Sequence, residues 1–417
     1  MKKSEKNTAL TAAASGAGTN AAEQRDEELE LARKVQTALV PRRLPTVDGV
    51  ELSSLYLPSR QLGGDIFDVV QLSNDLLAVV IFDVASSGVP AALLASLAKV
   101  SFANHLRLVT SPRAVIERVN EELVRTVAVD CFITALVAYL DLHDNRLTYC
   151  NAAHPYPIIY RRAGGALEPM KSTGVCMGLF ENGPFEEKSL YLSSGDWLLF
   201  FTDGIYSLFS GMNDLAGRKI LEAEMLKAVK TDSPRQFTRQ LETLYQSAQI
   251  RGAFGDDITV LALELLTQSR KNLLKEKLGF RENDSVYLQF ISYFEDMDRA
   301  TSIILSAMDS LGYADDIIRK MKIMLTELFA NAIYHGNKGD HSKKVVVGHT
   351  IDKNKIVVSI MDEGEGFDPA KVPDPTLPEN LIKDCGRGIY IVRNYADSVV
   401  FNQKGNRVTI TKNHAAP

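Results

Sequence analysis

The sequence lacks the features that mark secreted, membrane-spanning and nucleic-acid-binding proteins. Its four cysteines are scattered without a close pair, which argues against a disulfide framework and against a zinc site. No apolar run approaches the length that crosses a bilayer, and no signal-peptide core follows the N-terminal lysines. The formal net charge of −5 leaves no basic domain for nucleic acid. We therefore expect a cytoplasmic protein with no membrane and no nucleic-acid partner.

The composition is that of a globular protein too long for a single core. The 417 residues are 45% apolar and 24% charged, which fits two or three domains. Changes in periodicity predict five segments. These are a disordered tail over 1–22, a linker helix over 23–46, a first domain over 47–265, a charged linker over 266–284 and a second domain over 285–417. The helix over 23–46 either lies on its own domain or acts as a coupling or dimer helix, so a homodimer is one expectation.

Four aspartates in the first domain occupy strand ends. Asp83 and Asp203 each stop an apolar run of the kind that forms a buried strand. Asp65 follows a Gly-Gly pair, and Asp256 precedes the last apolar strand. Carboxylates at the ends of buried strands need compensation, and a divalent cation supplies it. Two such ions, Mn²⁺ or Mg²⁺, would activate a bridging water. The alternative is that each aspartate ends its strand as an ordinary turn residue.

One histidine of the first domain, His154, has a motif-like setting, Asn151-Ala-Ala-His154-Pro155. The proline beside it predicts a structural loop residue. A two-metal site would need no histidine or cysteine nucleophile.

Five patches of the first domain resemble, in order, the metal-dependent PPM serine/threonine phosphatases of the bacterial SpoIIE/RsbU branch. The patches are Gly63–Asp68, Asp83-Val84, Asn151–Pro155, Thr202–Gly204 and Asp256–Thr259. The resemblance implies an αββα sandwich that hydrolyses phosphoserine or phosphothreonine in proteins with two Mn²⁺ or Mg²⁺ ions. It places Asp65, Asp83, Asp203 and Asp256 on metal-binding positions. The chain departs from the family at Ala85-Ser86-Ser87-Gly88, where relatives carry a Gly-His-Gly-like turn.

The second domain carries polar and glycine-rich boxes in a fixed order. Glu327 and Asn331 lie four residues apart, so they share one face of a predicted helix. Alone, such a pair is typical of a satisfied core contact. The box Asp362-Glu363-Gly364-Glu365-Gly366 then follows an apolar strand, and Gly386-Arg387-Gly388 opens a helix. Glycines at a helix start let backbone N–H groups approach phosphate.

That order resembles the GHKL (Bergerat) ATP-binding fold, most closely the RsbW/SpoIIAB anti-sigma-factor serine kinases, over about residues 285–413. The resemblance implies a smaller α/β sandwich that binds ATP with Mg²⁺. It implies that Asn331 binds Mg²⁺, that Asp362 binds the adenine amino group and that Glu327 takes the proton from a substrate serine. It assigns the ATP lid to Gly364, Gly366, Gly386 and Gly388. The whole chain is then of α/β (α+β) class.

The leading hypothesis is a bifunctional partner-switching regulator. The first domain would dephosphorylate a small STAS-type anti-sigma-factor antagonist, and the second would bind ATP and phosphorylate such a protein or bind a sigma factor. Because the two reactions would otherwise waste ATP, we expect nucleotide in the second domain to control the first. In one alternative the second domain only binds nucleotide or a partner. In another the first domain is a non-enzymatic scaffold.

Overall fold

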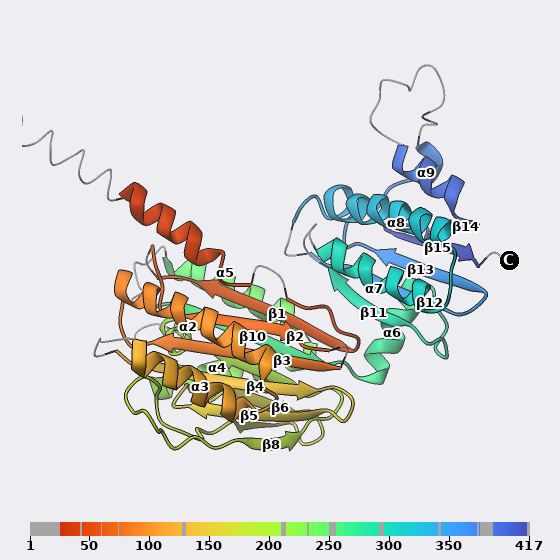
Figure 1. Cartoon of the computed structure of the whole chain (residues 1–417). Coiled ribbons are helices and arrows are strands. Elements are labelled where there is room, and N and C mark those ends of the chain that lie inside the picture. The colour runs from red at the N-terminus through yellow and green to blue at the C-terminus, as the bar shows by residue number, and fades with distance from the viewer. Residues whose placement is uncertain are drawn as a thin grey trace, which may run out of the picture. The chain divides into compact units, whose positions relative to one another are not determined.

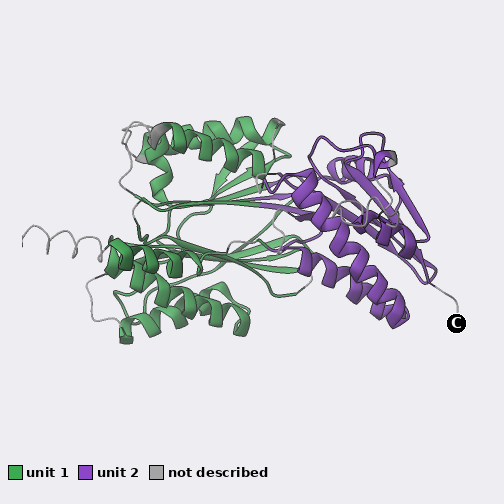
Figure 2. Cartoon of the chain, turned by 90° about the horizontal axis from the view of Figure 1, so that it is seen from above, with its two compact units in different colours: residues 1–44, 53–193, 197–262 green, residues 45–52, 194–196, 263–417 purple. Residues whose placement is uncertain are grey.

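The computed structural model describes residues 26–41, 44–59, 61–73, 75–126, 131–209, 214–231, 233–249, 256–291, 296–340, 343–372, 375 and 387–414. The predicted tail over 1–22 lies outside these residues. The chain forms two compact units, shown in different colours in Figure 2. Unit 1 comprises Met1–Leu44, Ser53–Ser193 and Trp197–Ala262, and unit 2 comprises Pro45–Leu52, Ser194–Asp196 and Leu263–Pro417.

The first sheet of unit 1 has the strand order β2-β3-β4-β5-β8 and is antiparallel throughout. Its strands are β2 (Ile66–Gln71), β3 (Leu76–Val84), β4 (Ile133–Asp141), β5 (Arg146–Ala152) and β8 (Lys188–Tyr191). Two helices, α2 (Val89–Leu108) and α3 (Pro112–Thr126), cover one face of this sheet. The ring of Phe102 in α2 stacks on Phe82 in β3, with ring centroids 5.2 Å apart.

The second sheet of unit 1 has the order β1-β10-β9-β6-β7. Its strands are β1 (Val50–Leu57), β10 (Ile258–Leu265), β9 (Trp197–Phe201), β6 (Ile158–Arg161) and β7 (Ala166–Pro169). The helices α4 (Asp214–Thr231) and α5 (Pro234–Gln249) share a buried core with it, in which Trp197 and Phe201 meet Phe237. Helices lie outside and strands between them (Figures 1 and 2). The expectation of an αββα sandwich is confirmed.

Helix α2 is the one helix, within the described part of the chain, whose length and composition would permit it to cross a membrane, and 44% of its most apolar window is buried. It follows Gly88, whose φ of 76° suits glycine, and Pro90 occupies its first turn. Ala95, Ala98 and Phe102 are completely buried against the sheet. The helix is therefore part of the core of unit 1.

Unit 2 is built on one antiparallel sheet of order β11-β12-β13-β15-β14. Its strands are β11 (Tyr287–Ile291), β12 (Val345–Ile351), β13 (Lys355–Met361), β15 (Arg407–Asn413) and β14 (Ser398–Phe401). The helices α7 (Asp296–Ser310) and α8 (Asp315–Ala330) pack on one face, and the short helix α9 (Arg387–Tyr395) contacts α8. The expected smaller α/β sandwich is confirmed.

The segment over 266–284, which the charge pattern predicts to be a linker, contains the helix α6 (Gln268–Leu278). The hydroxyl of Thr267 caps its start by accepting from the backbone N–H of Arg270, and Gly279 ends it in the left-handed conformation. Leu274 and Leu278 are buried in a cluster with residues of the sheet. Two leucines four residues apart are enough to attach a helix that is otherwise charged, which is why composition alone predicts a linker here.

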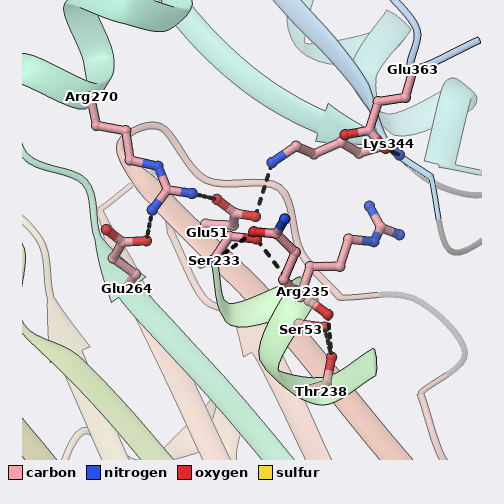
Figure 3. A network of polar contacts seen from close by, with 10 residues as sticks. Glu51, Ser53, Ser233, Arg235, Thr238, Glu264, Arg270, Lys344 and Glu363 are labelled. Carbon is pink, nitrogen blue, oxygen red and sulfur yellow. Dashed lines mark hydrogen bonds and ion pairs between the residues drawn. The ribbon is translucent and has the colours of Figure 1, made fainter. Parts of the chain in front are cut away.

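An ion-pair network within unit 2 ties the ends of β1 and β10 to α6 and β12 (Figure 3). The guanidinium of Arg270 binds Glu51 of β1 at 2.8 Å and also pairs with Glu264 of β10. The Nζ of Lys344 binds the other oxygen of Glu51 at 3.1 Å. Both glutamate side chains are only 3% exposed, so removing Arg270 would take one cation from two buried charges at once.

Candidate metal centre and nucleotide pocket

Two of the predicted ligands, Asp65 and Asp83, lie at ends of neighbouring strands of the first sheet. Asp65 immediately precedes β2 and is 1% exposed. One of its oxygens, Oδ2, accepts hydrogen bonds from the hydroxyls of Thr202 (2.6 Å) and Thr259 (2.8 Å). Thr259 lies in β10 and Thr202 directly follows β9, both strands of the second sheet, so Asp65 is fixed across the interior of the sandwich. Asp83 is the second-last residue of β3, opposite Thr134 of β4.

Asp257, which the sequence interpretation passed over, organises the loop before Asp65. Its Oδ1 accepts from the backbone N–H of Ser59 at 2.7 Å, and its Oδ2 accepts from that of Gly64 at 2.7 Å. The doublet Asp256-Asp257 is the signal that would have revealed it. One aspartate of the doublet holds the loop while the other remains exposed.

A second missed residue, Gln36, lies in the helix over residues 26–37. Its Nε2 donates to the carbonyl of Gly63 at 2.6 Å, and its Oε1 accepts from the N–H of Gly63 at 3.0 Å. Gln36 is 5% exposed. This pair attaches the N-terminal helix to the loop that carries Asp65.

The carboxylates of the predicted metal site lie close enough to perturb one another. Burial, followed by the negative charges of Asp203 and Asp256, raises the pKa of Asp83 to about 7. Burial, followed by the charge of Asp83, also raises the pKa of Asp65 well above its ordinary value. The structure therefore brings together four aspartates that are up to 191 positions apart in the sequence, from Asp65 to Asp256.

The donor set fits divalent cations. Hard carboxylate oxygens are the ligands that Mg²⁺ and Mn²⁺ prefer, and a cation would remove the mutual repulsion of the carboxylates. As they stand, the described residues include no group of three or more His, Cys, Asp or Glu side chains that surrounds one point. The charges of Asp203 and Asp256 act on Asp83, and the charge of Asp83 acts on Asp65. Their role as ligands remains a prediction.

Unit 2 contains a cavity of about 850 Å³ at the predicted nucleotide site. Among its lining residues are Glu327, Asn331, Asp362, Gly366 and Gly388, so five of the predicted residues meet in one place. Gly364 lies beside the cavity, in contact with the carboxylate of Asp362. Gly386 lies outside the described residues.

Glycines allow the walls of this cavity to approach closely. α8 continues as a turn of π-helix over Asn331–Gly336, a rare conformation that is common at functional sites. A Cβ on Gly336 would overlap the carboxylate of Asp362, and one on Gly388 would overlap that of Glu327. Gly366 has a φ of 79°, and a Cβ there would overlap the carbonyl oxygen of Lys404.

The polar groups that line the cavity suit a ligand that carries negative charge and has a hydrogen-bond donor at one end. Burial raises the pKa of Asp362, whereas a hydrogen bond from the N–H of Gly364 at 2.8 Å and the charge of Lys404 act against the rise. Basic side chains from other segments also belong to residues that line the cavity, among them Lys338 and Lys371. Such charges attract phosphate groups.

Asn337, which the sequence interpretation missed, supports a wall of this pocket. Its side chain is 3% exposed. Its Oδ1 accepts from the N–H of Glu363 at 2.9 Å, and its Nδ2 donates to the carbonyl of Lys344 at 3.2 Å. It therefore joins the end of the π-helical turn to the loop that carries Asp362.

Comparisons with known proteins agree with this division. Residues 73–266 match the family model of stage II sporulation protein E (SpoIIE), and residues 292–412 match the histidine kinase-like ATPase domain. The phosphoserine phosphatase RsbU of Bacillus subtilis is 24% identical over 178 residues, 43% of this chain and 53% of that protein.

Serine kinases and anti-sigma factors are among the relatives of the C-terminal region. The serine-protein kinase RsbW of Bacillus subtilis is 31% identical over 109 residues, 24% of this chain and 68% of the kinase. An anti-sigma F factor of Oceanobacillus iheyensis is 30% identical over 131 residues, 30% of this chain and 89% of that factor. The chain spans only about half the length of the curated phosphatase relatives that it matches.

Proposed function

Because the chain belongs, through its C-terminal region, to the family of RsbW serine kinases and anti-sigma F factors, and carries a SpoIIE-type region before it, we propose that it is a bifunctional partner-switching regulator. Unit 1 hydrolyses phosphoserine or phosphothreonine on a STAS-type antagonist protein, with Mn²⁺ or Mg²⁺. Unit 2 binds ATP with Mg²⁺ and phosphorylates an antagonist or binds a sigma factor. The observation that carries the proposal is the cluster of aspartates from four separate segments of unit 1.

In the phosphatase reaction, Asp65, Asp83, Asp203 and Asp256 would hold the ions. Bound metal would supply a water of lowered pKa and would neutralise charge on the phosphoryl group. Thr202 and Thr259 keep one carboxylate oxygen of Asp65 turned inward. Asp257 holds the backbone that carries Asp65, so the loop needs little reorganisation when a phosphoprotein arrives.

In the kinase reaction, the chain would act mainly by positioning and charge neutralisation. Asp362 would accept from the adenine amino group at the buried end of the cavity, and Asn331 would bind the Mg²⁺ that accompanies ATP. Glu327 would accept the proton of the substrate serine, because it faces the start of α9 at Gly388. Lys338 and Lys371 would attract the phosphates.

We also propose that nucleotide in unit 2 controls the phosphatase. Glu363, next to Asp362, accepts at 3.2 Å from the N–H of Lys344, and the Nζ of Lys344 binds Glu51 on β1. Since β1 continues from unit 2 into unit 1, a change at the Asp362 loop has a path into the phosphatase sheet through this hydrogen bond, this ion pair and the backbone of β1. The test is the phosphatase rate with and without ATP, and identical rates would remove this idea.

The deciding experiment incubates the purified chain with candidate STAS proteins. Phosphorylated protein with Mn²⁺ should lose phosphate, and unphosphorylated protein with Mg-ATP should gain it. Glu327→Ala should remove the second reaction and keep the first, because Glu327 belongs to unit 2 alone.

The second candidate function, a phosphatase with a regulatory binding module, would be favoured by ATP binding without phosphoryl transfer from the wild type. Retained hydrolysis after chelation of all divalent metal would contradict the metal assignment itself.

A further inference from the structure

The setting of His154 in unit 1 differs from that of an ordinary loop residue. It is 1% exposed, although its proline neighbour predicts a structural loop. Its Nδ1 lies 3.1 Å from the hydroxyl of Thr134 in β4. The ring also lies near the backbone of Phe201, the last residue of β9, although its Nε2 makes no hydrogen bond of acceptable geometry. The imidazole thus lies between the two sheets.

The residues that His154 touches are neighbours of the predicted ligands. Thr134 is directly opposite Asp83 in the β3–β4 ladder. Phe201 precedes Asp203 by two residues. Asp83 belongs to the first sheet and Asp203 follows a strand of the second, so the separation of their carboxylates depends on how the sheets are spaced at this end. His154 fills the space between the two attachment points.

The turn that carries His154 is fixed by hydrogen bonds to Asn151. The N–H of His154 donates to Oδ1 of the fully buried Asn151 at 2.8 Å, and Nδ2 of Asn151 donates to the carbonyl of His154 at 3.2 Å. Ala153, which directly precedes His154, has a φ of 57°, a left-handed conformation that alanine adopts only when its surroundings impose it. The ring therefore has little freedom to move.

We propose that His154 is a positioning residue of the metal centre: its buried imidazole spaces Thr134 from the end of β9 and thereby sets the distance between Asp83 and Asp203. The inference rests on the proposed metal-dependent phosphatase. Burial lowers the pKa of His154 to about 3, while the backbone groups of Phe201 and Thr134 oppose the shift. The ring therefore stays neutral at physiological pH and adds no positive charge that would repel a cation.

The test is Mn²⁺ affinity of the full-length chain, measured by titration with detection of free Mn²⁺ by electron paramagnetic resonance. Residues behind metal ligands typically contribute about 10–100-fold to metal affinity. We expect His154→Gln and Thr134→Val each to weaken Mn²⁺ binding by about that factor. The double variant should bind Mn²⁺ only slightly more weakly than either single variant, because both substitutions remove the same contact.

Two matched variants separate positioning from simple loss of stability. Thr134→Ser keeps the hydroxyl and should restore most of the affinity. His349→Gln removes another buried histidine, in β12 of unit 2 and 4% exposed, and should leave Mn²⁺ binding unchanged. At saturating Mn²⁺, the KM for a phosphoprotein should stay constant in the His154 and Thr134 variants, since neither residue is assigned to substrate.

The outcomes distinguish the two levels of the proposal. Wild-type Mn²⁺ affinity in a folded His154→Gln or Thr134→Val variant would overturn the role of His154 and leave the phosphatase intact. Absence of Mn²⁺ binding by the wild type would overturn the metal centre and the positioning role with it. If His154→Gln fails to fold, Thr134→Val against Thr134→Ser decides the question.

Discussion

The two candidate sites of this chain differ in what defines them: clustered charges in unit 1 and closely packed backbone in unit 2. In unit 1 the predicted ligands are like charges gathered at strand ends, and the pKa of Asp83 rises to about 7 through burial and the charges of its neighbours. In unit 2 the walls come close because glycines such as Gly366 and Gly388 have no side chain to obstruct them. In unit 1 the carboxylates repel one another, and a bound cation would reduce that repulsion. In unit 2 the cavity has room for a ligand.

This difference predicts how the sites respond to change. A site made of like charges should lose function when one carboxylate is removed and should tolerate small changes in side-chain volume. A cavity lined by close backbones should be sensitive to a single methyl group, because no flexible side chain is available to move aside. The following variants test whether the two units obey these separate rules.

The largest expected effect is on unit 1. Asp203→Asn keeps the shape of the side chain and removes one negative charge from the cluster around Asp83. Since a direct ligand should contribute more than its supporting residues, hydrolysis of a phosphoserine protein with Mn²⁺ should fall by more than about 100-fold. ATP binding by unit 2 should not change. Retained Mn²⁺-dependent hydrolysis would refute the metal assignment.

The next variant adds one methyl group in unit 2. Gly366→Ala would place a Cβ against the carbonyl of Lys404 at a φ of 79°, a strain of about 1–3 kcal/mol. ATP affinity, measured by calorimetry, should fall by about 10-fold or more, since each 1.4 kcal/mol is tenfold. The control is Gly339→Ala, where φ is also positive (68°) but nothing lies within 4 Å. Equal losses in the two variants would show that conformational strain, and not closeness of the walls, explains the effect.

The sequence was sufficient for the architecture because its strongest signals are local. The run before Asp83 is completely apolar and becomes β3. Glu327 lies in the last turn of α8, and Asn331 directly follows that helix as the first residue of the π-helical turn. Asp65 and Asp83 could be singled out because carboxylates at the ends of buried strands are unusual at any position.

The supporting residues could not be predicted in the same way. Gln36 and Asp257 act on a loop that is 27 and 193 positions away, respectively, and nothing in their own neighbourhood reveals a partner. His154 has a local signal, the proline after it, which pointed to a loop. Its actual setting depends on the spacing of two sheets, a property of the packed fold that no single stretch of sequence contains.

A further variant compares the two buried histidines. Burial lowers the pKa of His349 to about 4, below the unfolded value of about 6.5. The unfolded chain therefore binds more protons between these values, so the stability that the neutral ring contributes is complete above pH 6.5 and is lost as the pH falls towards 4. Lowering the pH from 7 to 5 should therefore reduce the free energy of unfolding of unit 2 by about 2 kcal/mol through this group.

The measurement is urea denaturation followed by circular dichroism at both pH values. His349→Gln should reduce the acid loss in the transition assigned to unit 2. Fluorescence of Trp197, the one tryptophan of the chain, reports unit 1 separately and should be unaffected by this substitution. An equal acid loss in wild type and variant would show that other groups control the pH dependence of unit 2.

The smallest expected effect concerns backbone strain beside the metal centre. Unit 2 uses glycine at Gly366 and Gly405, where φ is 79° and 77°, whereas unit 1 places alanine at a φ of 57° at Ala153. Left-handed alanine costs about 1–2 kcal/mol, and glycine loses about 0.5–1 kcal/mol more chain entropy on folding. Ala153→Gly should therefore stabilise unit 1 by about 0.5–1 kcal/mol, seen as a higher urea midpoint in Trp197 fluorescence. Asn145→Gly, at a φ of 56°, should gain less, because asparagine tolerates this conformation. A loss of stability in Ala153→Gly would mean that the methyl group itself packs in the turn, and that unit 1, like unit 2, depends on close contact beside its site.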